Sequence, residues 1–187
     1  MISFDNTANA FEYKDNKQLK KANFLFTSMG YSWLVKIGTK ITPWAIRAGL
    51  PVKGLIRKTI FEQFIGGETL EETSAAVNKL GKFNVQVILD YGVEGGDYGE
   101  DEKDRSCDQF IKVVEYAATQ PNIPFISIKV TGIARFALLE KMDELMQKAE
   151  GTLVKRYEQT LEKLSTEERQ EWQRICNRME RICSLAA

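Results

Sequence analysis

The chain has 187 residues, of which 43% are hydrophobic and 28% are charged, and its formal net charge is zero. This composition is ordinary for a globular protein, and the length suffices for one domain with a core. The sequence has no histidine, which excludes Ser-His-Asp, Cys-His and HExxH chemistry within the chain. Cys107, Cys176 and Cys183 lack CxxC spacing and are interpreted as reduced thiols, so neither a disulfide framework nor a metal site is expected.

The charge is unevenly distributed along the chain. Residues 1–60 contain ten bases and three acids, a net charge of +7 that the remaining residues balance. Such a basic, partly apolar segment indicates contact with an anionic membrane surface or an acidic partner, or else the solvated face of ordinary helices. We find no secretory signal or membrane span, so we expect a cytoplasmic protein, at most peripheral to the inner membrane. Nucleic-acid binding is not expected, because the chain has no recognition motif.

The first 60 residues are predicted to form a helical arm. Apolar residues recur at spacings of three and four over residues 16–29, as expected for an amphipathic helix. Two shorter helical pieces are predicted over residues 31–40 and 43–49, and another runs from Pro51 towards Phe61.

Strands and helices alternate from residue 61 onwards. Strands are predicted over residues 61–65, 84–89 and 125–130. A helix begins at a capping box at Thr69 and ends at Gly81 in a left-handed conformation; others cover about 104–119 and the residues after Gly132. Two more helices follow, the second from a capping box at Ser165. The alternation predicts parallel strands in an α/β fold, with a boundary between residues 1–60 and 61–187.

Charged residues are predicted at the carboxyl ends of the strands, where ligands bind in parallel α/β folds. Lys129 interrupts an apolar strand, and Asp90 ends the neighbouring strand. The two side chains are suited to an amino acid's carboxylate and ammonium, or they form a structural ion pair; the residues alone leave both readings open. The glycines between Gly92 and Gly99 are flanked by acids, so this segment is interpreted as an acidic surface loop rather than a phosphate site.

Three segments at these strand ends resemble proline dehydrogenases. Residues 64–69 (FIGGET) resemble the family's first-strand segment F-x-x-G-E-T/D. Residues 88–94 (ILDYGVE) are similar to its second strand, and residues 125–132 (FISIKVTG) to its third. The helix from Ser165 also resembles the one leading towards the fourth strand, so the similarity covers about residues 55–187.

The resemblance implies a distorted (βα)₈ TIM barrel that holds FAD at the carboxyl ends of its strands. It implies oxidation of L-proline to Δ1-pyrroline-5-carboxylate, in proline catabolism to glutamate, with electrons passed to the quinone pool. It also implies that Lys129 pairs with the substrate carboxylate and that Asp90 orients Lys129. It assigns no residue of this chain to FAD.

The chain departs from the family after its third predicted strand. The D-A-E-E and R-G-A-Y segments, and the C-terminal helix with a tyrosine and an arginine pair, have no counterpart here. We therefore expect the first three strands of a barrel, truncated before the fourth and inactive alone. We expect it to self-associate through open barrel edges and through the inward faces of Val85, Val87, Ile126 and Ile128, which would lie exposed without the opposite barrel wall. A non-catalytic binding or regulatory fragment, and a different TIM-barrel enzyme, are the alternatives.

Overall fold

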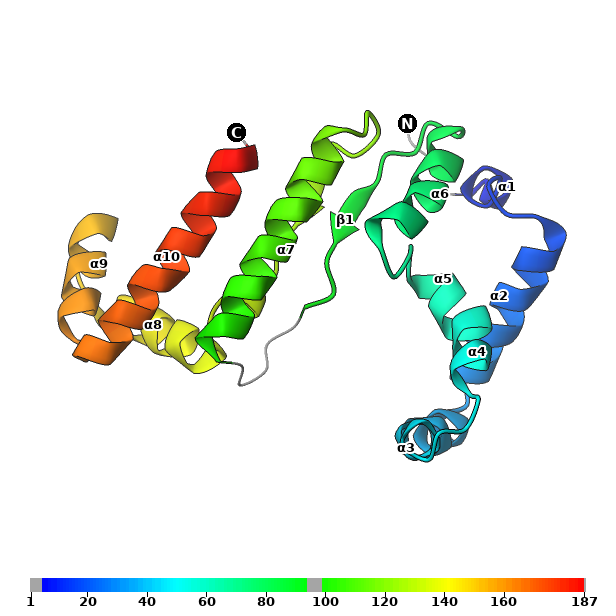
Figure 1. Ribbon diagram of the computed structural model, residues 1–187, viewed down its shortest axis with the longest axis horizontal. Coiled ribbons are helices and arrows are strands. Elements are labelled where there is room, and N and C mark those ends of the chain that lie inside the picture. Colours follow the sequence, from blue (N-terminus) through cyan, green and yellow to red (C-terminus); the bar gives the residue numbers. More distant parts are fainter. Residues whose placement is uncertain (1–4, 94–98, 187) are drawn as a thin grey trace. The chain divides into compact units, whose positions relative to one another are not determined.

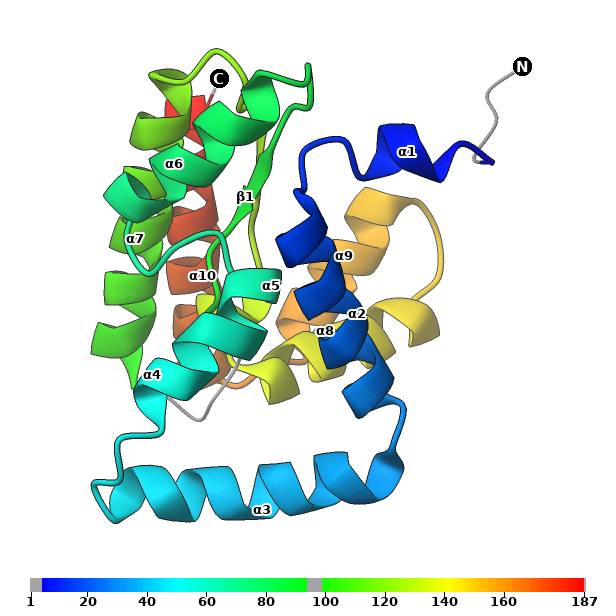
Figure 2. The ribbon, with the colours of Figure 1, turned by 90° about the vertical axis from the view of Figure 1, so that its right-hand side faces the viewer.

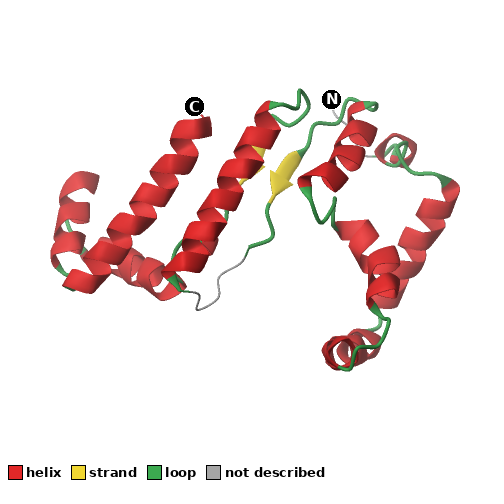
Figure 3. Ribbon diagram, in the orientation of Figure 1, coloured by secondary structure: helices red, strands yellow, loops and turns green. Residues whose placement is uncertain are grey.

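The computed structural model describes residues 5–93 and 99–186. The chain divides into two compact units, Met1–Val85 and Gln86–Ala187. Helices make up most of both units, and a small sheet lies in the second (Figure 3). The boundary predicted at residue 60 does not coincide with this division, because the helix that starts at Leu70 belongs to the first unit.

The first unit consists of helical segments joined by short turns (Figure 1). They are α1 (Thr7–Ala10), α2 (Asn16–Met29), α3 (Ser32–Arg47), α4 (Lys53–Ile56), a π-helical turn η1 (Arg57–Phe61), α5 (Glu62–Phe64) and α6 (Leu70–Gly81). The predicted helix over residues 16–29 is confirmed as α2. It begins at a capping box in which the Gln18 amide donates to Asp15 Oδ1 at 2.8 Å and the Asp15 amide donates to Gln18 Oε1 at 3.1 Å.

The two pieces predicted over residues 31–40 and 43–49 form one helix, α3, which continues through Pro43. The break is predicted because Pro43 is well suited to the first turn of a helix; inside a helix, proline removes one amide from the hydrogen-bond ladder. Only that one amide is missing, and the residues on both sides keep helical geometry.

The strand predicted over residues 61–65 is wrong: Glu62–Phe64 is helical and directly continues η1. The Ile65 amide donates to the Phe61 carbonyl at 2.8 Å, so the helix satisfies this backbone locally. Side-chain contacts hold the segment in place, since the Phe64 ring meets Phe26 edge-on at 5.9 Å between centroids. The apolar pattern FEQFI fits either a short strand or a helix, and its packing decides between them.

The second unit contains the two strands and the longest helices. Its elements are β1 (Ile88–Asp90), α7 (Glu100–Ala118), β2 (Phe125–Ser127), the 3₁₀ turn η2 (Val130–Gly132), α8 (Phe136–Lys148), α9 (Leu153–Glu162) and α10 (Thr166–Ala186). The strands pair in parallel, with Ile88 opposite Phe125 and Asp90 opposite Ser127. The order β1-α7-β2 confirms an α/β arrangement in part; the described residues contain two strands rather than three and do not form a barrel.

One face of the sheet packs on α7, which runs beside α10 (Figure 1). Ile126 lies on this face and packs against a core of Cys107, Phe110, Val114, Ile133 and Ile182. Its partner in β1, Leu89, is buried. The other face exposes 61% of Ile88 and 68% of Phe125. Ile126 and Ile128, which are predicted to face the barrel interior and lie exposed, instead pack on the helical core. Side chains alternate between the two faces of a strand, so a shift of one residue in the assignment exchanges the faces.

The helix ends follow the predicted chemistry fully at Ser165 and in part at Thr69. At the start of α10 the Glu168 amide donates to Ser165 Oγ at 3.2 Å, and the Ser165 amide donates to Glu168 Oε2 at 2.8 Å, which confirms the capping box. Thr69 caps α6 through the Glu72 amide, but the Glu72 side chain accepts from the Glu68 amide instead of closing the box. The left-handed residue after α6 is Asn84 rather than Gly81.

Candidate functional site

Asp90 and Lys129 come together at the carboxyl ends of the two strands. Lys129 Nζ lies 3.3 Å from Asp90 Oδ2. Asp90 is the last residue of β1 and pairs in register with Ser127, two residues before Lys129. Side chains two residues apart on a strand point to the same face, so the sheet brings the two charges together, as predicted. Their side chains are 49% and 30% exposed, which leaves both accessible to a ligand.

The residues around this pair hold the strand ends in place. Tyr91 follows Asp90 and packs edge-on against Phe110 of α7, with 5.6 Å between ring centroids. Gly132 lies close to the segment after β1, because a Cβ there would be only 3.0 Å from Val93 Cγ1. A larger residue at 132 would require Val93 to shift by a few tenths of an ångström, which favours a glycine at this point of the FISIKVTG segment.

The segment that resembles the family's first strand lies in the first unit. Gly67 is required there, since a Cβ would stand 2.7 Å from the Thr73 amide nitrogen. Glu68 forms an ion pair of 3.4 Å with Arg57, which also binds Glu72 at 2.7 Å. This segment therefore anchors the start of α6. Of the acidic loop predicted between Gly92 and Glu102, residues 94–98 lie outside the part of the chain that the structure describes.

FAD is the cofactor that the resemblance implies, and the described residues at the strand ends do not fit it by themselves. Dinucleotide pyrophosphates bind backbone amides at helix amino-termini. The helix that follows β1, α7, opens with Glu100, Asp101 and Glu102, whose carboxylates repel a phosphate. We therefore assign no FAD contact to a residue of this chain.

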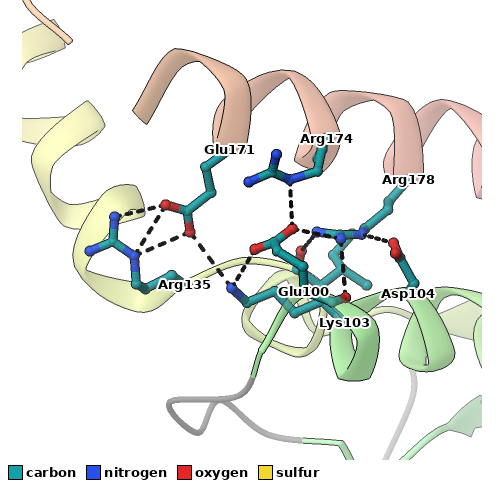
Figure 4. Close-up of polar contacts among 8 residues, drawn as sticks. Glu100, Lys103, Asp104, Arg135, Glu171, Arg174 and Arg178 are labelled. Atoms are coloured by element: carbon teal, nitrogen blue, oxygen red, sulfur yellow. Dashed lines mark hydrogen bonds and ion pairs between the residues drawn. The ribbon is translucent and has the colours of Figure 1, made fainter. Parts of the chain in front are cut away.

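A second charged cluster, which the sequence did not reveal, joins α7 to α10 (Figure 4). Arg178 is 2% exposed, and its guanidinium donates to Asp104 Oδ1 and Glu100 Oε2, each at 2.7 Å. It also donates to the Ile133 carbonyl at 3.1 Å. Lys103, 6% exposed, lies 2.9 Å from Glu100 and 3.6 Å from Glu171. The sequence does indicate that Arg178 is buried, because it lies three residues after Ile175 and four before Ile182, on the buried stripe of α10.

The cluster holds Glu100 ionised. Burial opposes its charge, but hydrogen bonds from Lys103, Arg178 and Arg174 outweigh burial and lower the pKa of Glu100 to about 2. This carboxylate is shared by three cations, so it is the centre of the α7–α10 contact. The arrangement is that of a structural clamp, because every labelled group faces another protein group (Figure 4).

This lowered pKa predicts an acid-sensitive fold. A carboxyl whose pKa is lower in the folded state stabilises the fold above its unfolded pKa, and the contribution is lost as pH falls from about 4.5 towards 2. We expect a loss of about 2 kcal/mol, reduced from the full linkage value of about 3 kcal/mol because the carboxylate is partly solvated. Urea unfolding across this range should show the loss in the unmodified chain. Glu100→Gln should remove most of it, and an identical pH dependence in the two proteins would contradict the assignment.

Comparisons with curated proteins identify two proline dehydrogenases. "Proline dehydrogenase 1, mitochondrial" of Dictyostelium discoideum is 32% identical over 96 residues, which cover 51% of this chain and 17% of that protein. The protein of the same name from Caenorhabditis elegans is 30% identical over 133 residues, 70% of this chain and 22% of its own length. The "Carbapenem antibiotics biosynthesis protein CarD" of Pectobacterium carotovorum subsp. carotovorum is 28% identical over 81 residues, 43% of this chain and 21% of that protein.

No family model matches the chain, and no solved structure does. The chain matches about a fifth of the length of these curated relatives. No helix within the described residues is both long and apolar enough to span a membrane. The two proline dehydrogenase matches agree with the family that the three sequence segments resemble. This chain is therefore related to the proline dehydrogenase family.

Proposed function

We propose that this chain supplies the carboxylate-binding edge of a proline dehydrogenase. In this proposal Lys129 binds the carboxylate of L-proline, and Asp90 is a positioning residue that fixes the ammonium of Lys129. The observation that supports it most is the Asp90–Lys129 pair at the carboxyl ends of adjacent parallel strands. These are the ends at which α/β proteins bind their ligands.

The exposure of the pair favours a binding role over a structural one. An ion pair this accessible contributes about 0–1 kcal/mol to stability, which is little reason for a lysine just after an apolar strand. A charge-assisted hydrogen bond from the same ammonium to a substrate carboxylate contributes more free energy, about 1.5–3 kcal/mol. The apolar face formed by Ile88 and Phe125 lies on the same side of the sheet as Asp90 and suits a hydrocarbon ring.

The proposed reaction is oxidation of the proline C–N bond to the C=N bond of Δ1-pyrroline-5-carboxylate, with loss of two electrons and two protons. FAD is proposed as the electron acceptor on the resemblance alone, held by segments without a counterpart in this chain. The quinone pool, which lies in a membrane, is proposed as the final acceptor. Because those segments are needed, we propose that the 187-residue chain alone does not oxidise proline.

The coding sequence downstream of Ala187 tests this proposal at once. In-frame segments of the D-A-E-E and R-G-A-Y type would support an enzyme to which this chain contributes its first part. An open reading frame that stops at Ala187 would contradict the enzymatic role and favour a non-catalytic binding or regulatory protein. A downstream sequence with other segments at the strand ends would favour a different TIM-barrel enzyme.

The isolated chain is expected to self-associate and to leave added FAD unbound. β1 and β2 each have one edge without a partner strand among the described residues, and the face with Ile88 and Phe125 is apolar and exposed. Burying about 400 Å² of such surface gains roughly 10 kcal/mol, comparable to the cost of association. Light scattering should show dimers or larger species that Phe125→Lys weakens. Phe24→Lys, at a site 74% exposed in the other unit, is the control. A monomer, or a protein that turns yellow with FAD, would refute this expectation.

A further inference from the structure

Helix α3 exposes almost its whole surface. Among its residues only Ala45 is buried, and Trp33 and Trp44 are 62% and 63% exposed. In Figure 2 it runs along the lower edge, with α2 and α4 of the same unit meeting its two ends. Exposed apolar residues in such number on one helix mark an interaction surface.

Four exposed apolar residues of α3 form a stripe with a tryptophan at each end. Trp33, Ile37, Ile41 and Trp44 follow one another at spacings of four, four and three residues, which places them on one side of the helix. Ile37 and Ile41 are 45% and 52% exposed. Tryptophan side chains combine an apolar ring with a polar N–H, so they suit the boundary between water and hydrocarbon.

The basic residues of α3 form a second stripe beside the first. Lys36, Lys40 and Arg47 are separated by four and seven residues, so they also share one side of the helix. Each lies within about one turn of a tryptophan of the apolar stripe. The sequence from Asn16 to Phe61 contains nine basic residues and no acidic one. A surface that complements this helix electrostatically therefore carries negative charge along the whole length of the helix.

We propose that α3 is an interfacial helix that binds the surface of an anionic lipid bilayer. Its apolar stripe would enter the boundary between head groups and acyl chains, and its basic stripe would contact anionic head groups. The absence of acids favours a bilayer over a protein partner, because protein surfaces carry both signs of charge. Helix α3 is also too short and too basic to cross a membrane, so it would lie in the plane of the surface. The proposal rests on α3 alone and does not depend on the enzymatic function.

Tryptophan fluorescence tests this proposal on the 187-residue chain. Vesicles of phosphatidylcholine with phosphatidylserine should shift the emission to the blue, and brominated acyl chains should quench it. The third tryptophan, Trp172, lies on α10, where its indole N–H donates to the Tyr157 hydroxyl at 2.8 Å. It serves as an internal control. Trp33→Phe with Trp44→Phe should therefore bind the vesicles without a shift or quenching. Vesicles of phosphatidylcholine alone should bind more weakly.

Charge reversal gives the second arm of the test. Lys36→Glu, Lys40→Glu and Arg47→Glu together should lower vesicle partitioning by about a hundred-fold or more, since each base near an anionic surface contributes roughly five-fold. The same change at the exposed residues Lys112, Lys155 and Lys163 keeps the net charge equal to that of the first triple variant and should have a much smaller effect.

Equal losses in the two triple variants would overturn the proposal. So would a blue shift that depends on protein concentration and not on vesicles, which would assign α3 to contacts between copies of the chain. A full-length protein that oxidises proline without binding vesicles would reject this proposal and leave the enzymatic one intact.

Discussion

Arg178→Ala should unfold or strongly destabilise the second unit, by about 3–5 kcal/mol. Its guanidinium is almost fully buried and is the shared donor for Asp104, Glu100 and the Ile133 carbonyl. Removing it leaves Glu100, which holds a pKa of about 2, without one of the three cations that keep it ionised. A partly buried carboxylate that loses such a partner costs more than the lost attraction alone. Chemical denaturation followed by circular dichroism measures the change.

Arg181→Ala is the matched control. Arg181 comes from the same helix and binds Asp108 of α7 at 2.8 Å, almost the same distance as in the Arg178 pair. Both members of the control pair are about half exposed, so solvent screens the attraction and its loss should cost at most about 1 kcal/mol. Similar losses in the two variants would show that burial of Arg178 does not control the α7–α10 contact.

Lys129→Ala in the full-length protein should raise the KM for L-proline by roughly ten- to a hundred-fold. This follows from the loss of one charge-assisted hydrogen bond to the substrate carboxylate, about 1.5–3 kcal/mol. Because the carboxylate is bound in the ground state and the transition state alike, kcat should change less than KM. Steady-state kinetics with proline as the varied substrate separates the two parameters.

Two variants control for a general effect of lost charge. Lys148→Ala removes a lysine from an exposed i,i+4 pair with Glu144 on α8 and should leave KM unchanged. Asp90→Asn keeps Lys129 charged but removes its 3.3 Å counter-ion, so it should raise KM by less than Lys129→Ala does. An unchanged KM in Lys129→Ala would refute the binding role, whatever the behaviour of the other two variants.

The sequence was most informative where local chemistry decides the structure. Helix α2 begins and ends at the predicted residues, because its apolar spacing and its capping box at Asp15 act within a few residues. The parallel pairing of the two strands, and with it the Asp90–Lys129 contact, followed from the alternation of strands and helices. The family relationship rested on three sequence segments, two of which lie at the ends of β1 and β2 and one of which lies before α6.

The errors arose where packing between distant residues decides the structure. The segment from Phe61 to Ile65 has no pattern that distinguishes a short strand from a helix, and contacts such as Phe64 with Phe26 are absent from local sequence. The prediction exchanged the two faces of the sheet and placed Ile126 on the exposed face instead of Phe125. Both faces of β2 are apolar in sequence, so the sequence does not distinguish them. Arg178 was overlooked because arginine is rarely buried, although its position on the apolar stripe of α10 was visible.

The most direct test of the proposed function is the absorbance of the full-length protein before and after addition of L-proline without oxygen. We predict flavin bands near the visible blue region that bleach with L-proline and do not bleach with D-proline, with Lys129→Ala requiring far more L-proline for the same bleaching. A purified full-length protein without flavin, or a flavin whose absorbance L-proline leaves unchanged, would contradict the assignment of this chain to a proline-oxidising enzyme.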